Sequence, residues 1–360
     1  WGKIIPVSGD NVVLTIDSYL QEAAWDALEG KPGAIVVMDV RDGSILAMVS
    51  SPSFDPNLFR AGISARDWKK LSSDPFHPLE NRAISGQYPP GSTYKLMVAA
   101  AAVEEGIVTP STSFNCSGSF DMGNRKFHCW NKKGHGRVSL HRAIVQSCDV
   151  YFYNVGKLLG VDKIAEYSKA FGFGSITGID LPREKPGIIP TRKWKLSRFK
   201  VPWQVGETIS VAIGQGFNTV TPLQLVGAYA ALANGGTVWK PRIIKQIESV
   251  DGQIVKAFAP ERKGVLPLSK DTVEELRSGL WGVVNEGGGT GSALRRKEAD
   301  VAGKTGTSQV VGLPQDEKGN RTKKTLAARF KDHALFVCFA PYKSPEIAVA
   351  VIAENAGGGG

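Results

Sequence analysis

A serine and a lysine three residues apart could form a nucleophile and its base. Ser92 and Lys95 have this spacing, which places two side chains on one face of a helix. A neutral lysine amine can take the serine proton and leave an oxygen that attacks carbonyl carbon. The spacing alone is weak evidence, because Ser197 and Lys200 share it and a helix cap beside a solvated lysine would explain it equally well.

A second group with catalytic potential is Ser147-Cys148-Asp149. We expect it at the junction of two helices, where a hydroxyl and a carboxylate two residues apart can face one cleft. One of them could relay a proton, while the other could bind a substrate amide or hold the lysine. The alternative is an ordinary helix cap, for which serine and aspartate are the usual residues.

A third group is Lys304-Thr305-Gly306-Thr307, expected on a short strand. Its lysine and first threonine could bind a substrate carboxylate, and Gly306 removes a side chain where a backbone must approach a ligand. The N–H of Thr307 could donate to a developing oxyanion. A phosphate-binding loop is excluded, since the glycine that it needs five residues before Gly303 is Glu298.

Three of the four cysteines and one histidine cluster in the middle of the chain: Cys116, Cys129, His135 and Cys148. Three sulfurs and an imidazole suit a closed tetrahedral zinc site, although the spacing is not that of a standard zinc finger. Two other readings stay open, a disulfide between the first two cysteines or buried free thiols. Two neighbouring residues could replace one of the ligands, namely Asp121 and His128.

Hydrophobic periodicity and turn residues predict the elements that position these groups. Helices are expected at 18–29, 93–105, 139–144, 150–159, 222–235 and 272–284, and an irregular stretch at 52–90. Strands are expected at 34–40 and 44–49, joined by an Asp-Gly turn, around Lys304, and at 334–339 and 347–352. The last two must be antiparallel because their connection is short. Together these predict one α/β domain whose terminal strands share a sheet, with a helical lobe inserted.

Composition excludes several protein classes. The 360 residues are 42% hydrophobic and 22% charged, unlike disordered, collagen-like or coiled-coil chains. The longest apolar run, 96–103, is far shorter than the roughly 20 residues of a membrane-spanning helix. The net charge of +10 favours anionic partners but equally fits a solvated basic surface. No signal peptide precedes Trp1, and we therefore expect an excised domain with an amino-terminal anchor outside this chain.

In combination and in this order, the three groups resemble the Ser-x-x-Lys, Ser-x-Asn and Lys-Thr-Gly elements of penicillin-binding proteins and serine β-lactamases. Further segments look like class B transpeptidases, most of all their elongation-specific subgroup, and the resemblance covers 11–355. These segments are Gln87–Lys95, Gly178–Leu181, Gly214–Gly216 with Thr221–Gln224, and Asp332–Phe336.

The resemblance implies a role for each motif residue. Ser92 would be the acylated nucleophile and Lys95 its general base. The positive charge of Lys304 would favour the uncharged form of the Lys95 amine. Ser147 would shuttle the proton to the leaving group, and Asp149 stands where asparagine is usual. Lys304 and Thr305 would bind the donor carboxylate, and the backbone N–H groups of Ser92 and Thr307 would form the oxyanion hole. Some members of the subgroup hold zinc with acidic, histidine and cysteine ligands at positions like those of the cysteine cluster.

The resemblance also implies an α+β fold, an antiparallel five-stranded sheet flanked by helices. Residues 1–360 would be one transpeptidase domain, with a sheet subdomain of 1–50 and 290–356 and a mostly helical subdomain of 51–289. The implied function is peptidoglycan D,D-transpeptidation during cell elongation, at the periplasmic face of the bacterial inner membrane. No cofactor is expected for the chemistry, and zinc would be structural. Expected partners are stem peptides, β-lactams, a membrane glycan polymerase and elongation scaffold proteins, but no nucleic acid.

Other functions of the same fold are a D,D-carboxypeptidase, a β-lactamase and a β-lactam sensor or scaffold. A β-lactamase needs a device for rapid deacylation, such as a Glu-x-x-Leu-Asn element, but Glu166 is followed by Lys169 and Ala170. A basic nucleic-acid binder is disfavoured, because the sequence has no recognised nucleic-acid motif.

Overall fold

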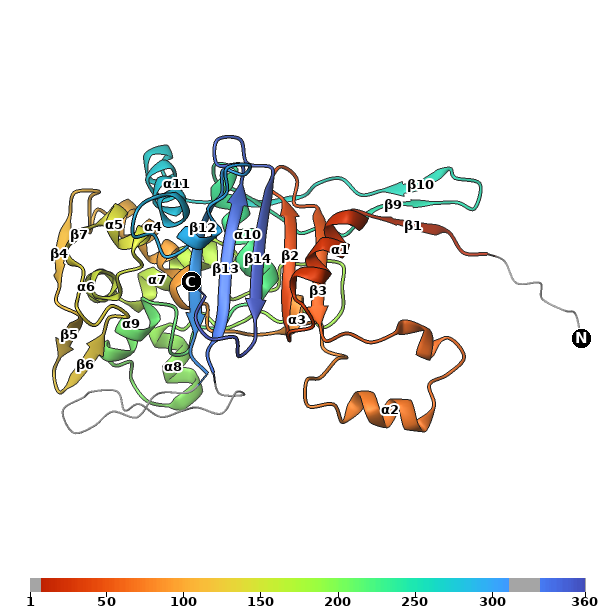
Figure 1. Cartoon of the computed structure of the whole chain (residues 1–360), viewed down its shortest axis with the longest axis horizontal. Helices are drawn as coiled ribbons and strands as arrows, with labels where there is room; N and C mark the ends of the chain where they lie inside the picture. The colour runs from red at the N-terminus through yellow and green to blue at the C-terminus, as the bar shows by residue number, and fades with distance from the viewer. Residues whose placement is uncertain (1–7, 311–330, 360) are drawn as a thin grey trace, which may run out of the picture.

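The computed structural model describes residues 8–310 and 331–359. At its centre lies a five-stranded antiparallel sheet in the order β12-β13-β14-β2-β3, with β12 at one edge (Figure 1). The strands are β2 Gly33–Asp39, β3 Ile45–Ser51, β12 Ala302–Ser308, β13 His333–Ala340 and β14 Ile347–Ala353. Both ends of the chain therefore contribute to one sheet, which confirms the predicted class. Within the predicted subdomains, positions 1–7 and 311–330 lie outside the described residues.

Helices cover both faces of this sheet. Helix α1 (Ser18–Ala27) begins at Asp17, whose carboxylate accepts the Leu20 N–H at 3.0 Å. It packs on one face through a small apolar cluster, formed by Ala24, Leu28, Ile35, Val37, Ala47 and Val49. Helices α10 (Pro222–Ala233) and α11 (Lys270–Asn285) contact the sheet strands and join the main core, which includes Ala34, Val36 and Met38. Alternate residues of β2 thus serve the two cores, as the pleat of a strand requires.

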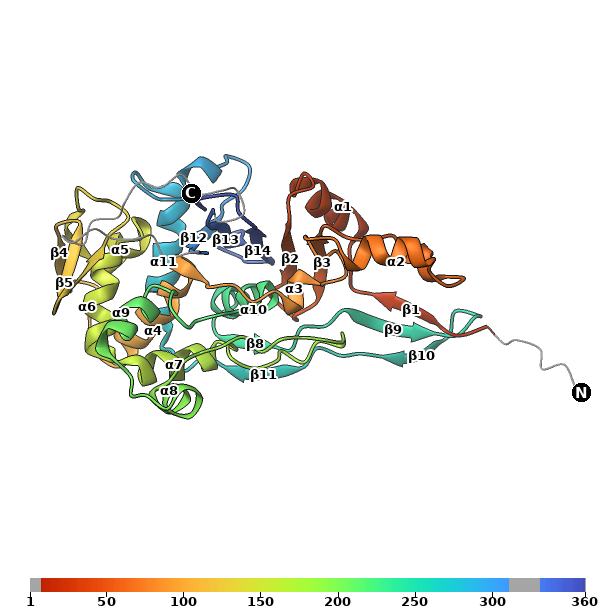
Figure 2. The same ribbon diagram turned by 90° about the horizontal axis from the view of Figure 1, so that it is seen from below.

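The inserted lobe is built around one almost fully buried helix, α4 (Lys95–Glu104). Other helices surround it (Figure 2): α5 Leu140–Val145, α6 Asp149–Leu159, α7 Val161–Ala170, α8 Arg192–Phe199 and α9 Val205–Val211. Two small strand pairs lie at the outer end, β4 with β7 (Ser113–Cys116, Gly136–Ser139) and β5 with β6 (Ser119–Met122, Arg125–His128). Cys116 of the cysteine cluster ends β4, Cys129 directly follows β6, and His135 directly precedes β7.

Several predicted elements need correction. The stretch expected to be irregular contains helices α2 (Ala65–Ser72) and α3 (Arg82–Ser85) and the short 3-10 turn η1 (Pro56–Phe59). The helix expected at 93–105 begins only at Lys95, after a 3-10 turn. A further 3-10 turn, η3, spans Ser292–Leu294. The predictions also lacked helices α7, α8 and α9 and nine strands. These strands are β4 to β7, given above, and β1 Asn11–Leu14, β8 Thr237–Trp239, β9 Ile244–Glu248, β10 Ile254–Ala257 and β11 Arg262–Val265.

Strand β1 pairs with β9 and not with the central sheet. Together with β10 they form a separate three-stranded arm that projects from the body (Figures 1 and 2). Across residues 8–310 and 331–359, no helix combines the length and apolarity needed to cross a membrane.

Candidate active site

A tight turn brings Ser92 against the edge strand β12. The 3-10 turn η2 (Gly91–Tyr94) precedes α4, and the Lys95 N–H donates to the carbonyl oxygen of Ser92. Gly91 has a φ of +54°, and a Cβ there would lie 2.3 Å from the Thr307 carbonyl oxygen. Only glycine allows the two backbones to come this close. The turn therefore fixes Ser92 beside the Lys304–Thr307 segment.

Lys95 reaches both members of the second motif. Its side chain is 1% exposed, and Nζ lies 2.8 Å from the Ser147 carbonyl oxygen and 3.1 Å from Ser147 Oγ. The same Nζ is 2.7 Å from Asp149 Oδ1. Ser147 has a φ of +52°, a strained conformation for a non-glycine residue. These contacts confirm that the first two motifs come together.

Asp149 holds the lysine, one of the alternatives that the sequence left open. Its second oxygen accepts the Trp130 backbone N–H at 2.8 Å. The indole N–H of Trp130 donates to the carbonyl oxygens of Gln146 and Ser147, at 3.0 and 3.1 Å. Trp130 was missed by the sequence analysis, and its position directly after Cys129 was the only available signal.

Lys304 is a second buried cation in this region. It is 1% exposed, and its Nζ donates to the Thr305 carbonyl oxygen at 3.3 Å. Burial, together with the positive charge of Lys95, holds the pKa of Lys304 well below its usual range, while Asp149 acts in the opposite direction. Two buried lysines therefore lie near a single carboxylate. The binding of an additional anion at this site is electrostatically favoured.

Six of the eight predicted catalytic and substrate-binding residues meet at one cleft of about 530 Å³, whose lining includes neither Lys95 nor Lys304. It is lined by Ser92, Ser147, Asp149 and Thr305–Thr307, with Trp130, Gln215 and Thr290 among the others. The hydroxyls of Thr290 and Thr305 are 2.7 Å apart, and Gln215 Nε2 donates to the Thr307 carbonyl oxygen at 2.9 Å. Sequence reasoning gave Thr290 no role.

Gly306 needs to be a glycine for a different reason from the one predicted. A Cβ there would lie 2.9 Å from Thr93 Cγ2 and 3.1 Å from the Pro90 carbonyl oxygen. The close approach is therefore between β12 and the nucleophile turn. Gly306 still lines the cleft, but packing within the protein already requires its small size.

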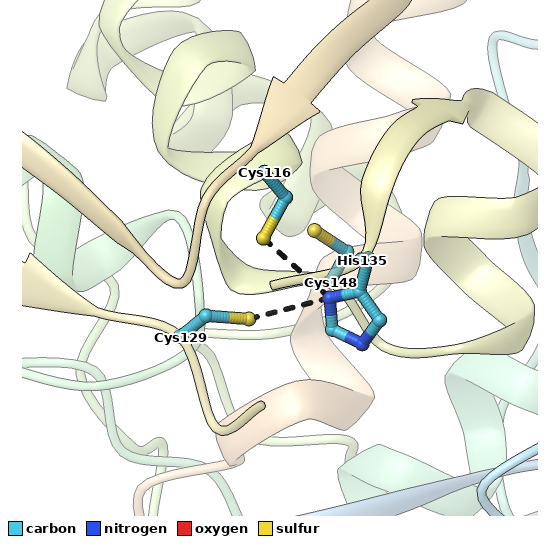
Figure 3. Close-up of side chains that lie close together, drawn as sticks. All are labelled: Cys116, Cys129, His135 and Cys148. Carbon is cyan, nitrogen blue, oxygen red and sulfur yellow. Dashed lines mark hydrogen bonds between the residues drawn. The ribbon is translucent and has the colours of Figure 1, made fainter. Parts of the chain in front are cut away.

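The cysteine cluster lies immediately behind Trp130. Figure 3 shows His135 Nδ1 directed toward two sulfurs, at 3.5 Å from Cys116 Sγ and 3.6 Å from Cys129 Sγ. With Cys148, the four ligand atoms lie within 4.8 Å of one another, and the group includes neither Asp121 nor His128. All three cysteines are buried and unbridged.

These separations fit a tetrahedral metal site. Zinc–sulfur and zinc–nitrogen bonds of about 2.3 and 2.0 Å place neighbouring ligand atoms roughly 3.5 Å apart, as is observed for His135 and its two sulfurs. A disulfide would instead bring two sulfurs to about 2.05 Å. By donor type, burial and spacing, these four residues could therefore hold a zinc ion.

Replacing Asp149 with asparagine should destabilise the fold and slow any reaction at Ser92. Lys95 and Lys304 would keep their burial but lose the carboxylate near both, and breaking a buried pair in this way costs about 3 kcal/mol. We expect the melting temperature to fall by roughly 4 °C in calorimetry. The exposed variant Asp251→Asn is the control, and an unchanged melting temperature for Asp149→Asn would contradict this role.

Comparisons with known proteins agree with this site. Residues 33–360 match the family described as "Penicillin binding protein transpeptidase domain". The chain is 44% identical over 358 residues to the peptidoglycan D,D-transpeptidase MrdA of Haemophilus influenzae, covering 98% of this chain and 54% of the relative. It thus spans about half the length of such curated relatives.

Two solved structures are similar over nearly the whole chain. PBP2 of Pseudomonas aeruginosa, in complex with WCK 5153, has a TM-score of 0.86 and 40% identity, covering 98% of this chain and 73% of that one. PBP2 of Helicobacter pylori, in complex with MreC, has a TM-score of 0.85 and 34% identity, covering 96% and 60%. With the family match, the shared fold and the assembled serine–lysine site in agreement, the chain belongs to the penicillin-binding protein transpeptidase domains.

Proposed function

We propose that this chain is a serine D,D-transpeptidase that cross-links peptidoglycan stem peptides during cell elongation. One observation carries the proposal: the buried Lys95 amine contacts Ser147 Oγ and Asp149 at the wall of the cleft that Ser92 and Thr305–Thr307 also line. This cleft and its wall therefore bring together a nucleophile, a base, a hydroxyl relay and a carboxylate-binding strand. The name of the H. influenzae relative supports the same reaction.

The reaction would proceed through an ester on Ser92. Ser92 Oγ attacks the carbonyl carbon between the two terminal D-alanines, and its proton passes to the amine of Lys95. The peptide C–N bond breaks, and the leaving D-alanine amine takes a proton through Ser147. An acceptor amine from a second stem peptide then attacks the ester carbonyl. The new amide forms, and the proton of that amine returns to Ser92 Oγ.

Lys304 and Thr305 would bind the terminal carboxylate of the donor. A buried lysine whose pKa is lowered well below its usual range by burial and by Lys95 gains most from an added anion. The Thr290 hydroxyl lies 2.7 Å from that of Thr305 and can contribute a further hydrogen bond to the bound carboxylate. The backbone N–H groups of Ser92 and Thr307 would donate to the oxyanion.

The mass of the intact chain after treatment with benzylpenicillin tests this function. Penicillin mimics the donor peptide, so we expect one covalent adduct per chain, on Ser92, that persists for many minutes. The chain would also fail to turn over a chromogenic cephalosporin beyond one equivalent. Rapid return to the unmodified mass would instead indicate a β-lactamase, and no adduct at all would remove the acyl-enzyme mechanism.

We also propose that Cys116, Cys129, His135 and Cys148 hold a structural zinc ion. The proposal is supported by ligand separations of 3.5 and 3.6 Å and by the burial of the thiols. Bound zinc would tie the loop of β4–β7 to the start of α6, and so stabilise Trp130 and Asp149. It would take no part in the acyl transfer.

The cellular setting is proposed from the same relationships. PBP2 of H. pylori was solved in complex with MreC, and we infer that a scaffold protein of this kind binds the full-length protein here. A membrane glycan polymerase would supply the strands to be cross-linked. Because such strands lie outside the cytoplasm, the domain would work at the periplasmic face of the inner membrane.

A further inference from the structure

Ser92 and Thr307 belong to different parts of the fold. Ser92 lies in the η2 turn before α4, the central helix of the inserted lobe, whereas Thr307 lies on β12 of the sheet. Acyl transfer needs the serine oxygen and the oxyanion donors at a fixed separation, because a misplacement of about 1 Å can slow a reaction roughly a hundredfold. Contacts that hold the η2 turn against the sheet therefore affect the reaction even when they touch no substrate.

Tyr88 joins the segment before this turn to one end of the sheet. It lies four residues before Ser92 and is almost fully buried. Its backbone pairs with that of Val220, and each N–H donates to the carbonyl oxygen of the other residue at 2.9 Å. The Tyr88 hydroxyl donates to Glu354 Oε1 at 2.7 Å. Burial and the charge of Glu354 raise the pKa of Tyr88 above its usual range, so the hydroxyl keeps its proton and remains a donor.

Glu354, which directly follows β14, is itself held by a buried arginine. Arg82 of α3 is 4% exposed, and its Nε donates to the same Glu354 Oε1 at 3.0 Å. The Nη2 of Arg82 donates to the Phe76 carbonyl oxygen at 2.5 Å, and the Glu354 N–H donates to the Pro32 carbonyl oxygen at 2.8 Å. Because charge-assisted hydrogen bonds are stronger than neutral ones, Glu354 gives Tyr88 a firmly placed partner.

The ring of Tyr88 contacts the sheet as well. It packs in a T-shaped arrangement against His333, the first residue of β13, with ring centres 5.6 Å apart and an interplanar angle of 89°. Strand β13 begins at the end of the sheet where β14 finishes, and α3 lies at this same end (Figure 1). His333 also pairs with Ser308, the last residue of β12. Tyr88 is therefore tied to the two strands that follow β12 in the sheet.

The link from Tyr88 to Ser92 is short and stiff. Pro89 and Pro90 follow Tyr88 directly, and the ring of each proline fixes its own φ. The next residue, Gly91, donates its N–H to the Gly214 carbonyl oxygen at 2.9 Å. A displacement of Tyr88 would therefore be passed on to Ser92, because the intervening backbone has little freedom to absorb it.

We propose that Tyr88 and Glu354 are positioning residues, which hold Ser92 at the correct distance from the oxyanion donor of Thr307. The inference rests on the proposed transpeptidase function and deepens it, since neither residue lines the cleft. Because other residues form the cleft that binds the donor, loss of the hydrogen bond between Tyr88 and Glu354 would slow the acylation step and leave donor binding unchanged.

Acylation by benzylpenicillin separates these two effects. Time courses over a range of penicillin concentrations give the dissociation constant of the initial complex and the rate constant of acylation. In Tyr88→Phe we expect the rate constant to fall about tenfold, the effect of one hydrogen bond to a charged group, and the dissociation constant to stay unchanged. Glu354→Gln, whose amide oxygen still accepts from Tyr88, should keep more of the rate constant than Glu354→Ala. Circular dichroism at the assay temperature checks that each variant is folded.

Tyr342→Phe is the matched control. The Tyr342 hydroxyl also donates to a glutamate, Glu274 Oε1, at 2.8 Å, but Tyr342 does not line the cleft or contact the η2 turn. It should acylate at the wild-type rate. A wild-type rate constant in folded Tyr88→Phe overturns the inference, as does an equal loss in Tyr342→Phe or a loss confined to the dissociation constant. A wild-type chain that forms no penicillin adduct would instead contradict the transpeptidase function itself.

Discussion

The variant Ser92→Ala should lose covalent labelling by penicillin, with a rate on the order of 10⁴-fold or more below that of the wild type. Its cleft would keep Lys95, Ser147 and Asp149 but contain no oxygen able to form the ester. The fold should be unchanged, because Ser92 donates no side-chain hydrogen bond among those found in the described residues. Fluorescent penicillin followed by gel electrophoresis gives the rate directly.

Ser197→Ala is the natural control for this prediction. Ser197 also precedes a lysine by three residues, but it lies in α8 (Arg192–Phe199), where both Ser197 and Lys200 are exposed. Lys200 adopts a left-handed conformation at the end of the helix, with a φ of +60°, so the pair does not face a cleft. Labelling of Ser92→Ala at the wild-type rate would refute the assignment of the nucleophile.

Removal of zinc should destabilise the domain and slow acylation together. We expect about one equivalent of zinc by elemental analysis in the wild type and almost none in Cys129→Ser. Because a ligand present at 1,000 times its dissociation constant stabilises the folded state by about 4 kcal/mol, the melting temperature should fall by roughly 5 °C. Penicillin labelling should also slow, since Trp130 follows Cys129 and contacts Asp149.

Cys338→Ala provides the matched control, because Cys338 lies on β13 and outside the cluster. It should keep its zinc and its rate of acylation. Zinc below about a tenth of an equivalent in the wild type, with a Cys116–Cys129 disulfide found by mass spectrometry, would contradict the metal site.

The sequence predicted which residues come together better than it predicted their individual contacts. Ser92 and Lys95 could be paired because a spacing of three has a definite meaning on a helical turn. For Asp149 the sequence left several roles open, because its contact with Lys95 spans 54 residues and depends on how α4 and α6 pack. No sequence pattern pointed to Trp130, because it contributes to the site only through its backbone N–H, bound to Asp149, and its indole N–H, bound to the Gln146 carbonyl oxygen.

Some elements that bury little were not predicted. Helix α2 has no buried residue, and all four residues of β10 are exposed, so neither contributes side chains to the core. The central strands were found because their side chains are buried on one or both faces. Buried surface, and not hydrogen bonding, made these elements visible in the sequence.

The edge position of β12 has a consequence for selectivity. An unpaired strand edge offers a row of backbone donors and acceptors, which most proteins protect because it invites aggregation. Here that edge borders the cleft. Among the described strands only β13 pairs with β12, and the Gln215 side chain already donates to the Thr307 carbonyl oxygen. A peptide that docks by strand addition is recognised through its main chain. Donor peptides that differ in their central side chains can then react at the same catalytic residues. A change of those side chains in the cell wall would require no change in the η2 turn that carries Ser92.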